Sequence, residues 1–298
     1  MGRAIALGMF DGVHLGHQAL LKDVKTYADE HQLKACAITF REAPIKWTAP
    51  QTQIQLITSL EERLLLFQDC GIDEVIVFEF PELVRLEAKH YLHNILKDQL
   101  DTRFVTCGIN HRFGRKQEGD FKFLSNWANE NNVACRVFQP IKDKEDKVVS
   151  SSLIRQTLRE GRLKEAIALL GYPVLCYQPL QQGQQQGRKL GYPTLNFSYP
   201  ADKVSLPIGV YAAKTELNGS WFASAVNLGF APTARQQMET PILESHILDF
   251  EPLMMPKVGD WIKIQLIEFI RPEKKFASLE DLKMQIAQDC DLVKRLIV

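Results

Sequence analysis

The sequence has 298 residues, a length at which two domains are the natural expectation. Its 36 basic residues balance 36 acidic ones, so no net charge favours binding to nucleic acid or to an anionic membrane. The first ten residues lack a long apolar stretch, and no run approaches about 18 apolar residues, so we expect neither a signal peptide nor a membrane span.

The cysteines are widely spaced and form no C-x-x-C pair. Several lie in apolar runs such as Phe104–Cys107, a setting typical of buried free thiols. This pattern favours a reducing compartment over disulfides or a zinc site, and we expect a cytoplasmic protein. The six positions are Cys36, Cys70, Cys107, Cys135, Cys176 and Cys290.

In the first half of the chain, short apolar runs alternate with segments of helical periodicity. Strands are expected at residues 4–7, 36–40, 75–78, 104–107 and 135–138, and helices at 16–31, 58–68, 88–99 and 121–131. Thr58-x-x-Glu61 offers a capping box for the second of these helices. Such alternation predicts an open α/β sheet of parallel strands. Ligands bind such sheets at the carboxyl ends of the strands, which is where the turn Gly8–Gly16 lies.

The second half of the chain has a different pattern of expected elements. Two short helices are expected at 152–170, followed after Gly171-Tyr172-Pro173 by a polar stretch at 181–187. Strands Gly209–Leu217 and Ser220–Asn227 are joined by Asn218-Gly219, the strongest local signal of a hairpin. Further strands at 244–250 and 261–269 and a helix starting at Ser278 complete the pattern. We therefore predict domains 1–170 and 171–298, the second an antiparallel sheet or small barrel with a terminal helix.

Residues 8–17, Gly-Met-Phe-Asp-Gly-Val-His-Leu-Gly-His, join the first strand to the first helix. The N–H groups that open a helix attract anions, and glycines allow a phosphate to approach the backbone. His14 and His17 are three residues apart and face one ligand across a helical turn, where each can donate a hydrogen bond to charge building on phosphoryl oxygens as pyrophosphate leaves. A metal pair and a structural glycine turn are the alternatives.

This segment resembles the H-x-G-H nucleotidylyltransferases, and within them the FMN adenylyltransferase module of bacterial bifunctional FAD synthetases. Residues 108–114 resemble that family's G-x-[DN]-F-x-F-G segment, with His111 in place of phenylalanine. Residues 150–155 are similar to its S-S-T-x-I-R motif, with Ser152 in place of threonine. The resemblance implies a Rossmann-like domain that transfers AMP from ATP to FMN with Mg²⁺. It makes His14 and His17 catalytic and assigns ATP binding to Gly8, Phe10, Asp11, Gly16, Asn110, Ser151, Ser152 and Arg155.

Residues 187–196 are dense in turn formers, and composition alone favours an irregular loop. The block resembles riboflavin kinase's G-R-x-L-G-[FY]-P-T-x-N, and matches continue at residues 227–229, 232–233, 243–250 and 271–276. The resemblance implies a β-barrel riboflavin kinase domain. Thr194 and Asn196 then lie beside the ATP-bound Mg²⁺, and Glu244 is the catalytic base. Gly183, Gly187 and Arg188 form its ATP loop.

In that loop, Gln185 and Gln186 stand where the kinase family has a glycine and an arginine. One hypothesis is therefore a bifunctional enzyme acting on ATP, FMN and riboflavin. The alternative is an FMN adenylyltransferase alone, with a weakened or inactive kinase domain retained for flavin binding or scaffolding. Two others are a flavin-binding regulator or storage protein, and a nucleotidylyltransferase for another phosphate ester.

Overall fold

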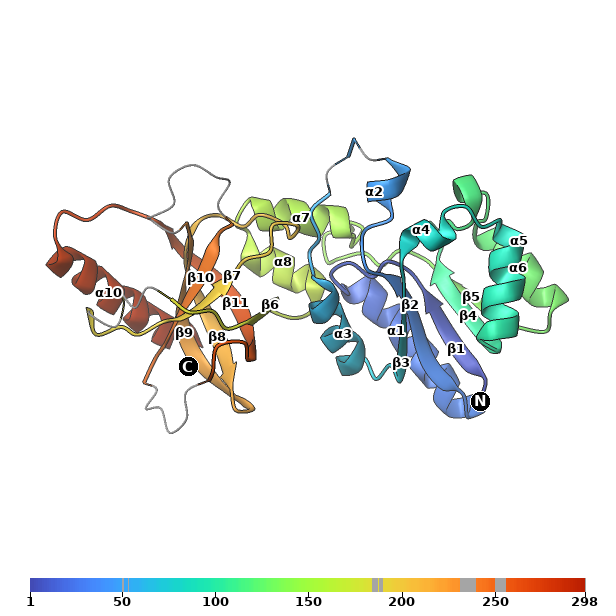
Figure 1. The fold of residues 1–298 in the computed structure, drawn as a ribbon, viewed down its shortest axis with the longest axis horizontal. Helices are drawn as coiled ribbons and strands as arrows, with labels where there is room; N and C mark the ends of the chain where they lie inside the picture. The colour runs from blue at the N-terminus through green and yellow to red at the C-terminus, as the bar shows by residue number, and fades with distance from the viewer. Residues whose placement is uncertain are drawn as a thin grey trace. The chain divides into compact units, whose positions relative to one another are not determined.

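The structure is a computed structural model that describes residues 1–49, 51–52, 54–183, 187, 190–230, 240–249 and 256–297 (Figure 1). The chain divides into two compact units. The first comprises Met1–Leu56 with Leu60–Ser151, and the second Ile57–Ser59 with Ser152–Val298. The helices of residues 151–170 group mostly with the second unit, and the domain boundary at 170/171 stays a prediction.

The first unit is built on a sheet of five parallel strands in the order β3-β2-β1-β4-β5. The residues of β1 from Ala4 to Leu7 are buried, as expected for a strand covered on both faces. The strand order reverses between β1 and β4, and such a switch point opens a crevice at the carboxyl ends of the strands. The bounds are β1 Arg3–Leu7, β2 Lys34–Phe40, β3 Glu74–Phe78, β4 Thr102–Gly108 and β5 Ala134–Phe138.

Helices cover both faces of this sheet. Helix α1 (Leu15–His31) packs on β1, β2 and β4. Ile5 and Leu7 of β1 point to the opposite face, into a core shared with the π-helix η1 (Tyr91–Gln99) and with α6 (Phe121–Glu130). The remaining segments are α2 Ile45–Thr48, α3 Leu60–Asp69, α4 Phe80–Leu83, α5 Ala88–His90 and the 3₁₀ turn η2 Arg115–Gln117.

Two local expectations for this unit need correction. The single helix expected at 88–99 is a short α5 that continues as the π-helix η1. Helix α3 begins at Leu60, so Ser59 and not Thr58 directly precedes it. Apolar periodicity could not have predicted either difference. It indicates where a helix lies more reliably than it indicates the helix type or the first residue.

The second unit holds two helices and a six-stranded antiparallel sheet in the order β6-β11-β8-β9-β10-β7. A bridge between Gln181 and Asn196 brings the two ends of this sheet together, so it forms the predicted barrel. Asn218 and Gly219 both have positive φ, as the predicted hairpin turn requires. The bounds are α7 Ser151–Arg159, α8 Leu163–Leu170, β6 Val174–Pro179, β7 Leu195–Ser198, β8 Gly209–Leu217, β9 Ser220–Gly229, β10 Ile242–Ile247 and β11 Trp261–Pro272.

The terminal helix α10 (Leu279–Ile297) packs on the barrel through Cys290 and Val293, which contact the core around Ala212. Ser278 starts it as predicted, because its hydroxyl accepts a 3.1 Å hydrogen bond from the Asp281 backbone N–H. All six cysteines are free thiols. Within the described residues, none of the helices combines the length and the apolar character needed to cross a membrane.

Candidate active sites

The turn after β1 has an unusual backbone. Phe10, Gly12 and Val13 all have positive φ, at 53°, 79° and 29°. Val13 closes the turn, since its N–H donates to the Phe10 carbonyl at 3.0 Å. A positive φ is costly for a β-branched residue, so the surrounding structure must hold this turn in place.

A buried arginine supplies part of that support. Arg63 of α3 is fully buried, and its Nη1 donates to the Met9 carbonyl at 2.9 Å and to Thr39 Oγ1 at 3.0 Å. Thr39 Oγ1 in turn donates to the same carbonyl at 2.8 Å. The guanidinium therefore fastens the start of the turn to β2. Sequence reasoning missed this role, because the polar run Glu61-Glu62-Arg63 is typical of a solvated helix face.

The two predicted histidines lie ring on ring. The ring centroids of His14 and His17 are 3.7 Å apart with an interplanar angle of 17°. Gly16 makes room for this stack, since a Cβ there would lie 3.2 Å from the His14 ring. His14 is the N-cap of α1 but makes no capping bond with its side chain, and the first turn holds no acidic residue. The start of α1 is therefore suited to an anionic ligand.

Two imidazole nitrogens at this site are buried without a hydrogen-bond partner among the described residues: Nδ1 of His17 and Nε2 of His111. Burial, and then the neighbouring His14, holds the pKa of His17 well below 6.5. Burial, and then Arg112, lowers the pKa of His111 to about 4. Both rings are therefore neutral at pH 7 and can bond to a ligand. The described side chains offer no group of three or more His, Cys, Asp or Glu residues for the metal alternative.

These groups line a pocket of about 230 Å³ at the switch point of the sheet. His111 lies in the motif at residues 108–114 but was given no role of its own, and the wall formed by residues 138–141 and Val149 was not predicted. The position of these residues after β4 and β5 is the signal that could have found them. The predicted residues that line the pocket are Gly8, Phe10, His14, Gly16, His17 and Asn110.

The other predicted residues of this site lie on or beside α7. Asp11 is buried, and its carbonyl accepts a 3.0 Å hydrogen bond from Ser151 Oγ at the start of α7. Arg155 lies four residues after Ser151, on the same face of that helix. Ser152 and Arg155 fall in the second unit, so their place beside the histidines stays a prediction.

The second unit contains a larger pocket, of about 910 Å³, that gathers the residues predicted for the kinase site. Gly183, Gly187, Thr194, Asn196 and Glu244 all line it. Arg188, like Gln185 and Gln186, lies outside the described residues.

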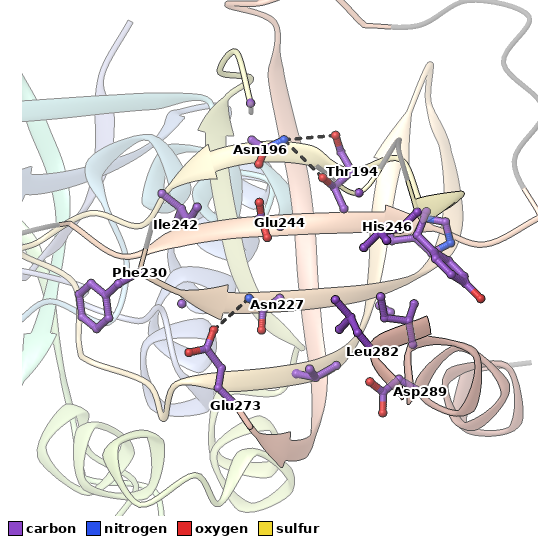
Figure 2. A pocket seen from close by; sticks show the side chains of 18 of the residues that line it. Thr194, Asn196, Asn227, Phe230, Ile242, Glu244, His246, Glu273, Leu282 and Asp289 are labelled. Carbon is purple, nitrogen blue, oxygen red and sulfur yellow. Dashed lines mark hydrogen bonds between the residues drawn. The ribbon is translucent and has the colours of Figure 1, made fainter. Parts of the chain in front are cut away.

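Three polar side chains form a row across the floor of this pocket (Figure 2). Glu244 on β10 lies opposite Asn196 on β7 and opposite Asn227 on β9, so all three share one face of the sheet. Asn196 Nδ2 donates to the Thr194 carbonyl at 3.2 Å, which leaves the amide oxygen as an acceptor. The irregular loop expected at 187–196 thus ends in β7, where pairing with β10 sets the position of Asn196.

The two glycines of the predicted loop approach other groups closely. A Cβ at Gly183 would lie 2.2 Å from Asn196 Nδ2, and a Cβ at Gly187 would lie 2.3 Å from the Tyr192 carbonyl oxygen. Neither position has room for a side chain unless its neighbour moves. The glycines therefore fix the shape of the pocket wall beside Asn196.

Charged groups from β11 and α10 complete the pocket. Burial, and then the neighbouring carboxylate of Glu273, raises the pKa of Glu244 above 4.5. Arg271 forms a bidentate ion pair with the buried Asp289 of α10, with its shortest contact at 2.7 Å. No individual role was predicted for Asn227, Arg271 or Glu273, although each lies in a segment that matches the kinase family.

Comparison with known proteins assigns a family to each half of the chain. The family model for FAD synthetase matches residues 1–152, and that for riboflavin kinase matches residues 170–297. A crystal structure from Streptococcus pneumoniae, described as a macrolide-efflux protein, superposes with a TM-score of 0.83 over 98% of this chain and 94% of that one. At 24% identity, this likeness shows the shared fold alone.

Curated relatives span nearly the whole chain. Bifunctional riboflavin kinase/FMN adenylyltransferases from Listeria monocytogenes and from Escherichia coli K12 are each 32% identical, over 97% of this chain and 90% of theirs. The corresponding protein of Bacillus subtilis is 31% identical over 96% of this chain and 89% of its own. The chain belongs to the family of bifunctional riboflavin kinase/FMN adenylyltransferases.

Proposed function

We propose that this enzyme makes FAD in two steps, with riboflavin phosphorylated to FMN in the second unit and FMN adenylylated in the first. One observation is the main support for adenylylation in the first unit. Among the residues that the structure describes, one imidazole nitrogen of His17 and one of His111 are buried without a hydrogen-bond partner, beside the N-terminus of α1. Buried polar atoms of this kind are normally satisfied, so they indicate a bound ligand.

In the adenylyl transfer, a phosphate oxygen of FMN attacks the α-phosphorus of ATP, and the bond to the β-phosphate oxygen breaks to release pyrophosphate. The FMN phosphate is already ionised, so this site needs positioning and charge stabilisation rather than a base. His14, His17 and the first turn of α1 donate hydrogen bonds to the developing charge. Asn110, Ser151, Ser152 and Arg155 are assigned to ATP by the family motifs they match. The switch-point pocket supports the assignment of Asn110, which lines it.

In the kinase step, the terminal hydroxyl of riboflavin attacks the γ-phosphorus of ATP, and ADP leaves. The nucleophile is a neutral alcohol, so a base is needed, and Glu244 accepts its proton. The raised pKa of Glu244 makes its carboxylate a stronger base. Thr194 and Asn196 offer oxygens close to the Glu244 carboxylate, a set that suits Mg²⁺, which takes few protein ligands and keeps several waters. When bound, the ion neutralises charge on the ATP phosphates.

An active kinase is favoured over the adenylyltransferase-only alternative. The match to the riboflavin kinase family runs through residues 170–297, and the described residues of the predicted kinase site gather in one pocket. The free thiols support a reducing compartment, and we assign the protein to the cytoplasm. Its proposed partners are the small molecules ATP, FMN and riboflavin.

The two steps can be separated by the label carried on ATP. With Mg²⁺ and FMN, the α-phosphate label should enter FAD with release of pyrophosphate. With Mg²⁺ and riboflavin, the γ-phosphate label should enter FMN. Labelled FAD without any phosphorylation of riboflavin would support the adenylyltransferase-only alternative. Flavin binding without transfer of either label would support a binding or storage protein.

A further inference from the structure

The second pocket contains an amide–carboxylate pair that the proposed kinase step does not use. Asn227 Nδ2 donates a 3.1 Å hydrogen bond to Glu273 Oε1 (Figure 2). We propose that these two residues form a positioning pair, in which Glu273 fixes the Asn227 amide so that its oxygen accepts a hydrogen bond from a hydroxyl of the polyol substrate beside Glu244. This inference rests on the proposed kinase reaction in the same pocket.

The register of the strands brings Asn227 next to the proposed base. Glu244 on β10 lies directly opposite Asn227 on β9. Side chains opposite each other on neighbouring strands lie on the same face with their Cβ atoms about 5 Å apart. A substrate hydroxyl that reaches Glu244 therefore comes within reach of the Asn227 side chain.

The chemistry of the pair fixes which end of the amide faces the substrate. An ionised carboxylate only accepts hydrogen bonds, so the nitrogen of Asn227 must face Glu273. The amide oxygen remains, and it can only accept. A hydroxyl is the complementary donor, and the ribityl chain of riboflavin carries several. The pair thus favours a polyol over an alcohol whose neighbouring carbons have no hydroxyl groups.

The surrounding backbone leaves room for this pair. A Cβ at Gly229 would lie 2.1 Å from Glu273 Oε1 and 3.1 Å from Asn227 Nδ2. Strand β11 shifts register between Phe269 and Arg271, just before Glu273. Irregularities of this type re-aim the residues that follow them, and the Arg271–Asp289 ion pair anchors the chain two residues before Glu273.

Glu273 also places a second negative charge near Glu244, which adds to the effect of burial on the pKa of that base. The other charged or titratable groups that line the pocket in the described residues stay in place when Glu273 is replaced. They are Tyr192 before β7, His246 on β10, Arg271 on β11, Lys274 and Lys275 after it, and Asp289 on α10.

Three variants of the full chain separate the hydrogen bond from the charge. Glu273→Gln removes the charge but keeps an acceptor for Asn227, so KM for riboflavin should stay close to that of the unmodified chain. Asn227→Asp sets two carboxylates against each other, and KM for riboflavin should rise about tenfold. The double variant Asn227→Asp with Glu273→Gln restores a donor and an acceptor, and should recover most of the loss.

FAD synthesis from added FMN shows in every variant that the first unit has folded, and urea unfolding compared with the unmodified chain checks the second unit. The inference is overturned if the double variant is no better than Asn227→Asp, or if Glu273→Gln raises KM for riboflavin as much as Asn227→Asp does. Failure of the proposed function looks different, because the wild-type chain would then form no FMN from riboflavin.

Discussion

The histidine at position 111 makes the stability of the first unit depend on pH. Its pKa is about 4 in the folded chain, against the ordinary histidine value of 6.5, so between these values the unfolded chain binds a proton that the folded chain does not. Stability is therefore complete above pH 6.5 and decreases as the pH falls towards 4. His111→Phe, which introduces the residue usual in the family motif, should remove this dependence.

The size of the effect follows from the shift. One pKa unit corresponds to about 1.4 kcal/mol. If the His111 ring stays fully neutral in the folded chain, the free energy of unfolding falls by about 2 kcal/mol between pH 7 and pH 5. The side chain is partly accessible to solvent, which reduces this to about 1–2 kcal/mol. His17 also lowers the free energy of unfolding as the pH falls. This effect is present in the unmodified chain and in His111→Phe, so it cancels when the two are compared.

The assay is urea unfolding of the substrate-free chain at pH 7 and pH 5, followed by the fluorescence of Trp127, which is buried in the core of the first unit. Trp47, Trp221 and Trp261 are replaced by phenylalanine in both proteins to isolate that signal. Ile109→Val, in the same pocket wall but without a titrating group, is the control and should change stability equally at both pH values. An equal effect of His111→Phe at the two pH values would refute the reasoning.

Three further outcomes follow from the two sites. Gly183→Ala should displace Asn196 and raise the Mg²⁺ concentration needed for kinase activity without affecting FAD synthesis from FMN; an unchanged Mg²⁺ titration would contradict the predicted metal site. Arg63→Met should lower the free energy of unfolding of the first unit by roughly 2–4 kcal/mol, because the Met9 carbonyl loses a charged donor, and a negligible change in a urea titration would contradict the proposed support of the turn. Kinase kcat/KM should fall as the pH drops through the raised pKa of Glu244, with a limb that is absent from FAD synthesis from FMN.

Much of the fold could be predicted because local and tertiary preferences agree. Buried strands of the parallel sheet, such as β1 and β4, appear as short apolar runs, and Asn218-Gly219 marks the hairpin of the barrel. The short strands β6 and β7 were missed, since their pairing partners are distant in sequence and their own pattern is weak. The type of helix at 88–99 also depends on packing rather than on periodicity.

The residues of the two sites also differ in how far the sequence predicts them. Residues within compact motifs, such as His14, His17 and Thr194, could be placed at the two pockets from spacing and resemblance. Arg63 and Glu273 were not, because their contacts join segments far apart along the chain. A buried arginine and an exposed one look the same in a sequence, and only the fold distinguishes them.

The central claim is that two separate sites carry out the two reactions, and paired variants test it most directly. His17→Ala and Glu244→Gln are each assayed with ATP and Mg²⁺, once with riboflavin and once with FMN. We predict that His17→Ala still forms FMN from riboflavin while its FAD synthesis falls by about 10²–10³. Glu244→Gln should make FAD from FMN but no FMN from riboflavin. If either substitution removes both activities from a folded chain, or if neither removes any, the account is contradicted.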